Sequence, residues 1–143
     1  MLPTGNPRMD AEQAFRRAAR ARRRAALLGT LRRSPAPALP VLDERELTRS
    51  PGSVVRGVRE IPLDAITATL EPARAPQFDR HFRPARIARC RWQRVWLAEH
   101  RGQPLPPISV MRVGDTYAVR DGHHRVSVAR ARGASTIDAV EVP

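Results

Sequence analysis

The sequence has one cysteine, no lysine and no long apolar run, and the first and last of these scarcities each exclude a class of protein. Cys90 has no second cysteine to pair with, which excludes an intrachain disulfide and is compatible with a reducing compartment. No apolar stretch approaches the roughly 20 residues that a membrane helix needs. Residues 1–8 also contain no apolar core of the secretory type. We therefore expect a cytoplasmic protein with no membrane partner.

Acidic residues are scarce as well. The 14 Asp and Glu residues face 26 basic residues, and the formal net charge is +12. Codon bias in a GC-rich genome would explain arginine in place of lysine, but it would not explain the excess of basic over acidic residues. Such an excess is typical of proteins that bind a polyanion. We favour a nucleic-acid or nucleotide partner over a surface that is merely basic.

Residues 1–33 are predicted to form a basic helical arm. Asp10 and Gln13 have capping-box spacing, and Gly29 would end the helix. An alanine-rich stripe could bury little area, so it would hold the helix weakly. The stripe consists of Ala14, Ala18, Ala21, Ala25 and Leu28. The arginines that could contact nucleic acid are Arg16, Arg17, Arg20, Arg23 and Arg24. The arm either lies along phosphates or is a solvated, alanine-driven helix, and the sequence leaves both open.

A proline-rich linker and an irregular segment, residues 34–57, should separate the arm from a domain over residues 58–143. The domain opens with a strand, which Pro62 forces to be an edge strand or to end. A helical turn follows, and residues 67–84 have little periodicity, which predicts a long loop.

The rest of the domain is predicted to contain a helix and three strands. The helix opens at Pro84 and carries both tryptophans on its apolar face, where core packing is their expected role. Residues 108–113 and 116–120 read as strands around a Gly-Asp hairpin turn, and residues 137–142 as a closing strand. The predicted fold class is α/β in the α+β sense: a small mixed sheet with packed helices, preceded by a basic N-terminal helix.

The most informative stretch is residues 117–133, YAVRDGHHRVSVARARG. It reads as a strand, a tight glycine turn and the start of a helix. Free backbone N–H groups and the positive end of the helix dipole meet there, which makes an anion site. The Arg125 side chain adds a planar fork suited to phosphate. We predict that a phosphate group is held by Asp121, Gly122, His123, His124 and Arg125.

The two adjacent histidines could donate hydrogen bonds to phosphate in either charge state. A protonated histidine would bind better, so affinity should rise as the pH falls through about 6.5. Zinc binding is the weaker hypothesis, because adjacent helical histidines point in different directions and His81 or His100 would have to converge on them. We predict no metal site formed by protein side chains alone.

Catalysis would need a second group near the turn. Glu71, in the predicted long loop, is the best carboxylate for a general base or a magnesium contact, and His124 would act with it. The alternative is that Glu71 is a solvated loop residue.

The order of elements from Val58 to Val142 resembles the N-terminal domain of ParB-type partitioning proteins, a fold shared with sulfiredoxin. The resemblance rests on IPLDAI, a proline-bearing loop, a helix, LPPISVMRVGDTYAVRDGHHRVSVARARG and a closing strand. Gly122 and Arg125 occupy the positions of the glycine and arginine of the ParB-like phosphate loop. A D-G-H-H-R motif also occurs in ParB-like proteins outside partitioning, including relatives of a free-serine kinase. The resemblance implies that residues 122–125 bind the phosphates of CTP or ATP, with Mg²⁺ as a candidate companion.

The sequence departs from this family in three respects. It ends after the closing strand, which leaves no room for the helix-turn-helix and dimerisation domains of a ParB. His123 replaces an acidic residue, which argues against nucleotide hydrolysis of the ParB kind. The loop also lacks a cysteine where sulfiredoxin has its catalytic one, and Cys90 lies on the preceding helix, so sulfiredoxin chemistry is not expected.

Three functions from different classes remain open. The favoured one is a ParB-like nucleotide-binding module that associates with DNA and could form a homodimer. The second is an enzyme, a phosphotransferase or a nuclease, that uses Glu71 and His124. The third is a protein-interaction module in which the loop is a relic.

Overall fold

The computed structural model describes residues 2–33, 38–47 and 56–143. The elements are α1 (Pro7–Leu31), β1 (Arg59–Pro62), β2 (Ile66–Thr69), α2 (Arg89–His100), β3 (Ile108–Val113), β4 (Thr116–Asp121), α3 (His123–Ala131) and β5 (Thr136–Glu141). The five strands form one sheet of order β1-β5-β3-β4-β2. Strand pairs β1/β5 and β3/β4 are antiparallel, whereas β5/β3 and β4/β2 are parallel. The predicted fold class, a mixed sheet with packed helices after a basic helix, is confirmed.

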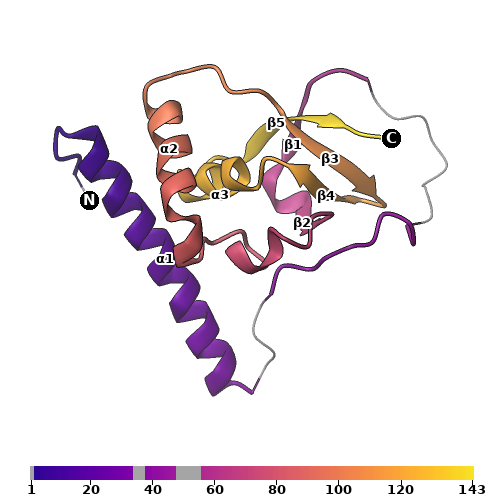
Figure 1. Cartoon of the computed structure of the whole chain (residues 1–143), viewed down its shortest axis with the longest axis horizontal. Helices are drawn as coiled ribbons and strands as arrows, with labels where there is room; N and C mark the ends of the chain where they lie inside the picture. The colour runs from indigo at the N-terminus through magenta and orange to yellow at the C-terminus, as the bar shows by residue number, and fades with distance from the viewer. Residues whose placement is uncertain (1, 34–37, 48–55) are drawn as a thin grey trace.

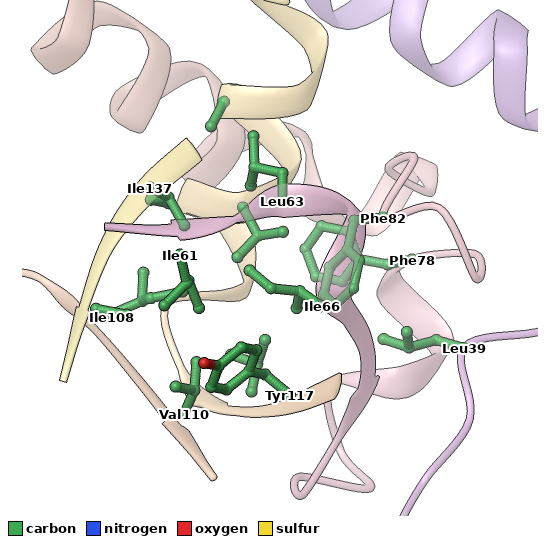
Figure 2. Close-up of a cluster of buried hydrophobic side chains, with 14 of the residues drawn as sticks. Leu39, Ile61, Leu63, Ile66, Phe78, Phe82, Ile108, Val110, Tyr117 and Ile137 are labelled. Carbon is green, nitrogen blue, oxygen red and sulfur yellow. The ribbon is translucent and has the colours of Figure 1, made fainter. Parts of the chain in front are cut away.

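The three helices form successive layers beside the sheet (Figure 1). Helix α3 packs against the strands, because Val126 and Ala129 belong to the same buried cluster as Ile61, Val110 and Val119. Figure 2 shows the strand side chains of this core. Helix α2 packs on α3, and α1 packs on α2. This order places the start of α3 at the end of the central hairpin, between the sheet and the outer helices.

Helix α1 is longer at both ends than the sequence predicted. It begins at Pro7, because the Asn6 side chain caps the helix by accepting a hydrogen bond of 3.1 Å from Arg8 N. The Asp10 carboxylate accepts instead from the backbone and hydroxyl of Thr4, at 2.8 Å each. The helix also continues through Gly29, since one glycine inside a helix costs only about 1 kcal/mol. The predicted cap at Asp10 and stop at Gly29 were therefore wrong.

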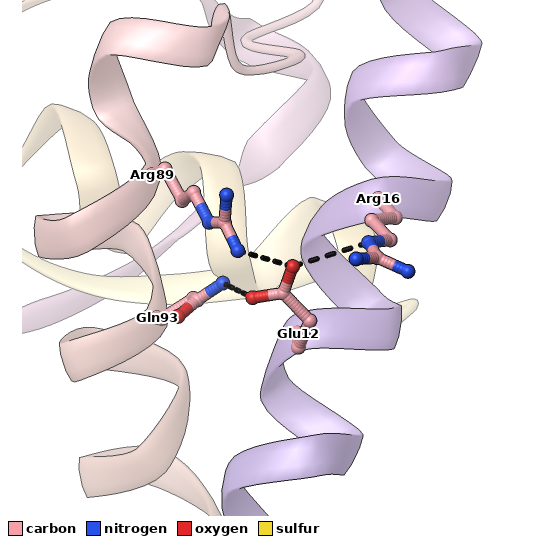
Figure 3. A network of polar contacts seen from close by, with 4 residues as sticks. All are labelled: Glu12, Arg16, Arg89 and Gln93. Carbon is pink, nitrogen blue, oxygen red and sulfur yellow. Dashed lines mark hydrogen bonds and ion pairs between the residues drawn. The ribbon is translucent and has the colours of Figure 1, made fainter.

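The first half of α1 is anchored by an aromatic contact that the alanine stripe did not reveal. Phe15 is buried, and its ring meets that of Trp92 edge-on at a centroid distance of 5.6 Å. Beside it, Glu12 accepts hydrogen bonds from Arg89 and, at 2.7 Å, from Gln93 (Figure 3). Since a buried aromatic ring holds a helix much more firmly than alanine methyl groups, this half is part of the packed structure.

The second half of α1 extends past the N-terminal start of α2 in Figure 1. Leu27 and Leu31 are exposed there, with relative accessibilities of 62% and 72%. Arg23 and Arg24 are exposed on the same half. This part of the helix therefore presents a basic and partly apolar surface to solvent.

Part of the segment expected to be a linker belongs to the edge of the sheet. Thr69 N donates to Pro40 O, and Leu42 N donates to Thr69 O, both at 2.9 Å. Leu39 is buried in the main core. Strand β2 is an edge strand, and this short segment satisfies backbone groups that would otherwise be unpaired. Residues 34–37 and 48–55 of the predicted linker and irregular segment lie outside the described residues.

The predicted long loop of residues 67–84 is shorter than expected. Strand β2 extends to Thr69, and Phe78 forms a β-bridge with Pro84. Helix α2 begins only at Arg89, after a 3₁₀ turn, so Pro84 does not open it. The sequence did not reveal β2 because a strand of four residues is too short to show a clear periodic pattern. The predicted edge strand β1, the β3–β4 hairpin and strand β5 are all present.

Candidate functional site

The β4–α3 turn has the strand–glycine–helix geometry that the sequence predicted. Gly122 follows β4 with a φ of 107° and caps α3. This φ is left-handed, and a Cβ at this position would lie 2.4 Å from Ile108 Cγ2, so only glycine fits. The first α3 hydrogen bond runs from Val126 N to Gly122 O at 3.0 Å. The N–H groups of residues 123–125 therefore have no acceptor within the helix, which is the arrangement that favours an anion.

The two histidines at this turn are buried. His123 is 3% exposed and His124 is 7% exposed. Thr69 Oγ1 lies 2.6 Å from the Nε2 atom of His123, which ties the turn to the end of β2. The ring of Phe78 stacks on that of His123 at 6.2 Å and meets that of His124 edge-on at 5.1 Å. Both imidazole rings are thus buried and pack against Phe78, and the ring of His123 also contacts Thr69.

Both histidines are neutral at neutral pH. Burial and, to a smaller extent, the charge of Arg74 lower the pKa of His123 from 6.5 to about 4. Burial also lowers the pKa of His124 to about 4, with contributions from Arg91 and Arg74. The expectation that phosphate affinity rises as the pH falls through about 6.5 is therefore corrected, because neither ring gains a proton in that range.

Two arginines near the turn were not among the predicted site residues. Arg74 and Arg91 are close enough for their charges to act on His124. Neither forms an ion pair with a residue in the described part of the chain. The signal available in the sequence was weak: Arg74 follows three residues after the candidate Glu71, and Arg91 is one of several arginines before Trp92. Only the packing of their elements brings them to the turn.

The side chain of Arg125 has different neighbours from those of the histidines. It lines a cleft of about 240 Å³ together with the carboxylates of Glu60, Glu99 and Asp138. Burial lowers the pKa of Arg125, and the charges of Glu99 and Asp138 act in the opposite direction. Residues two apart on a helix point in different directions, so the Arg125 guanidinium and the ring of His123 do not face each other. Asp121 of the turn also acts on the pKa of Arg125, but no hydrogen bond, ion pair or ring contact of the described residues joins the Arg125 guanidinium to either histidine.

The candidate catalytic residues share no described contact. Glu71 is exposed, and its backbone N–H donates to Thr69 Oγ1 at 2.9 Å. Thr69 therefore links the backbone of Glu71 to His123, whereas the contacts of His124 are with Phe78. Asp121, at the end of β4, is exposed beside the turn. The geometry supports binding at the turn more directly than it supports acid–base chemistry.

The predicted nucleic-acid arginines on α1 are all exposed. Arg16 pairs with Glu12 at 3.1 Å, and the other four form no ion pair with any residue that the structure describes. Over the described ranges, no three His, Cys, Asp or Glu side chains come together as a metal site would require. Within those ranges there is likewise no helix with the length and apolar character needed to cross a bilayer.

Comparison with known proteins adds a distant structural likeness. No protein family matches the sequence, and no curated protein matches it either. Among solved structures, the chain is similar to sulfiredoxin from Arabidopsis thaliana, with 22% identity and a TM-score of 0.43. The likeness covers 61% of this chain and 85% of that one.

Proposed function

We propose that this protein is a nucleotide-binding module that holds phosphate groups at the β4–α3 turn and associates with DNA. The observation that carries the proposal is the set of N–H groups at residues 123–125, which have no acceptor within α3. They lie at the positive end of the helix dipole, where a phosphate is stabilised. The D-G-H-H-R sequence, which resembles a ParB-like phosphate loop, also supports phosphate binding at this turn.

Phosphate at this turn would be bound by backbone groups and arginines rather than by charged imidazole. His123 and His124 are neutral, so their role would be structural: their contacts with Thr69 and Phe78 would hold the turn in position. The compensating positive charge would come from Arg74 and Arg91, because arginine suits phosphate geometry. A triphosphate such as CTP or ATP would bring its own Mg²⁺, with exposed Asp121 or Glu71 available as an outer contact.

Calorimetric titration of the chain with CTP, ATP, cytidine and adenosine tests the phosphate site. The triphosphates should bind at least tenfold more tightly than the nucleosides, which corresponds to about 1.4 kcal/mol. Arg74→Ala and Arg91→Ala should each weaken triphosphate binding. Arg94→Ala is the matched control, because Arg94 is exposed on α2 and does not act on the pKa of either histidine. Equal affinity for nucleoside and triphosphate would refute a phosphate site at the turn.

Amide chemical shifts locate the site within the same titration. The largest changes should fall on the N–H groups of residues 122–125. Changes confined to α1, with none at the turn, would assign the phosphate to the arginine-rich helix instead.

Association with DNA would use the arginines of α1. These side chains stand on a helix whose first half is already packed, so the helix does not need to fold on binding. Each phosphate contact contributes about 0.9 to the slope of log affinity against log salt concentration on duplex DNA. Replacing Arg23 and Arg24 by Ala should lower that slope by about 2, measured by fluorescence anisotropy. A slope that is flat, or that the double substitution leaves unchanged, would exclude this part of the proposal.

A further inference from the structure

A second cavity, of about 370 Å³, lies between α1 and α3, away from the β4–α3 turn. Its walls come from three separate segments: the middle of α1, residues 81–84, and the C-terminal half of α3. Cavities of roughly 300–1,000 Å³ are the usual size of small-molecule sites. None of the residues proposed to hold phosphate at the turn lines this cavity.

The ionisable side chains that line the cavity are all basic. Arg17, Arg83 and Arg130 line it, together with His81, and no acidic residue does. Arg83 is paired with Asp79 at 3.4 Å, and Arg130 Nη1 lies 3.8 Å from Asp64 Oδ1. Arg17 has no ion-pair partner among the described residues. The cavity therefore carries positive charge that the protein only partly balances.

The Arg130 side chain adds an unsatisfied donor to this wall. Its Nη2 atom donates to Leu63 O at 2.7 Å, which fixes the guanidinium. Its Nε atom is buried and has no hydrogen-bond partner. The Arg130 side chain as a whole is 21% exposed, so it can contact a ligand through its exposed atoms rather than through Nε.

The remaining walls are apolar. Ala14, Ala18 and Ala21 of α1 line the cavity together with Phe82 and Pro84. The alanine stripe that seemed too small to hold α1 thus has a second consequence. Because alanine side chains are short, they leave space between α1 and α3 where larger side chains would close the gap.

We propose that this cavity binds a small organic anion with an apolar body. Its carboxylate or phosphate would bind Arg17, Arg83 and the Arg130 side chain, and its apolar part would pack on the alanine methyl groups and Phe82. Arginine guanidinium groups bind both kinds of acid in forked geometry. The proposal is independent of the nucleotide site, because it uses different residues on a different part of α3.

Anilinonaphthalene sulfonate is a suitable probe, because it joins an aromatic body to one acidic group and fluoresces in apolar surroundings. We expect saturable binding of one probe per chain. The neutral compound phenylnaphthylamine, which has the same rings without the sulfonate, should bind about tenfold more weakly because charged hydrogen bonds are lost. Equal binding of the two compounds would overturn the role of the arginines.

Two pairs of variants locate the probe. Ala21→Leu fills the cavity and should weaken binding at least tenfold, whereas Ala25→Leu, one turn further along α1 and outside the cavity lining, should change it less than twofold. Arg17→Ala should weaken binding severalfold, whereas Arg8→Ala, exposed on the same helix, should not. Circular dichroism and thermal unfolding establish that each variant is folded. If Ala21→Leu is unstable, the Arg17 pair still decides the outcome. Indistinguishable binding by Arg17→Ala and Arg8→Ala would refute the site.

Discussion

The Nε2 atom of His123 lies 2.6 Å from the Oγ1 atom of Thr69, which joins the first residue of α3 to the last residue of β2. Thr69 is fully buried, and its hydroxyl also accepts a hydrogen bond from Glu71 N at 2.9 Å. These residues are 54 positions apart in the sequence. One buried hydroxyl therefore sets the position of the candidate phosphate turn relative to the edge of the sheet.

Replacing this hydroxyl should destabilise the protein. Thr69→Val keeps the shape of the side chain but leaves the buried ring nitrogen of His123 without its partner, which costs about 1–3 kcal/mol in the free energy of unfolding. Urea denaturation measures this loss. Thr67→Val is the matched control, because Thr67 lies on the same strand and is exposed, so its effect should stay within about 0.5 kcal/mol. Equal effects of the two substitutions would show that the hydrogen bond does not stabilise the fold.

Acidification should destabilise the protein before its carboxylates titrate. The folded state lowers the pKa of His123 and His124 from 6.5 to about 4, so it favours the neutral rings. The unfolded chain therefore takes up protons first as the pH falls below 6.5, and the stabilisation present above that pH is lost progressively towards pH 4. Each histidine contributes up to about 1.4 kcal/mol per pH unit in that window.

Urea denaturation between about pH 7.5 and 5.5 measures this dependence, because carboxylates stay largely ionised there. His124→Phe keeps an aromatic ring beside Phe78 and should reduce the slope, since one of the two most deeply buried histidines no longer titrates, whereas His81, whose pKa burial also lowers, still contributes. His100→Gln, at an exposed position, should leave the slope unchanged. A free energy of unfolding that stays constant over this range would contradict the burial of neutral histidines.

Gly122→Ala should be among the most damaging substitutions in the chain. The new Cβ would lie 2.4 Å from Ile108 Cγ2 and 3.3 Å from Ile108 Cα, and the backbone has a φ of +107°. Strain and overpacking together should cost about 2–5 kcal/mol, measured by thermal unfolding. Gly114→Ala is the control, since Gly114 also has positive φ, at +63°, but has nothing within 4 Å. Its cost should be only about 1 kcal/mol. Similar costs for both would mean that the contact with Ile108 relaxes freely.

Phe15→Ala should release α1 from the rest of the protein. The ring is 4% exposed and packs on Trp92, so its removal should cost about 3–5 kcal/mol. Hydrogen exchange in the first half of α1 should rise more than exchange in β3 and β4, because the helix can detach while the sheet stays folded. Leu28→Ala, at a position 43% exposed, should change neither quantity appreciably. Unchanged exchange in α1 of the Phe15 variant would show that alanine contacts alone hold the helix.

The candidate site divides into a part that local sequence predicts and a part that it does not. The turn at Gly122 was predictable, because a glycine between a β-pattern and a helical pattern marks a place where the backbone can adopt the positive φ that a tight turn needs. The charge state of His123 was not, because it depends on burial of the ring, against Phe78 among other residues, and on the charge of Arg74. Burial, rather than residue type, fixes that pKa.

The sequence alone determined the basic character of the protein, its mixed α+β class and the strand–glycine–helix turn, since each follows from composition or from short-range periodicity. Tertiary structure decided which side chains meet at the turn. It also decided how firmly α1 is held, and where a cavity remains between α1 and α3. Those features arise from contacts between residues that are distant along the chain, such as Phe15 with Trp92, and no local pattern records them.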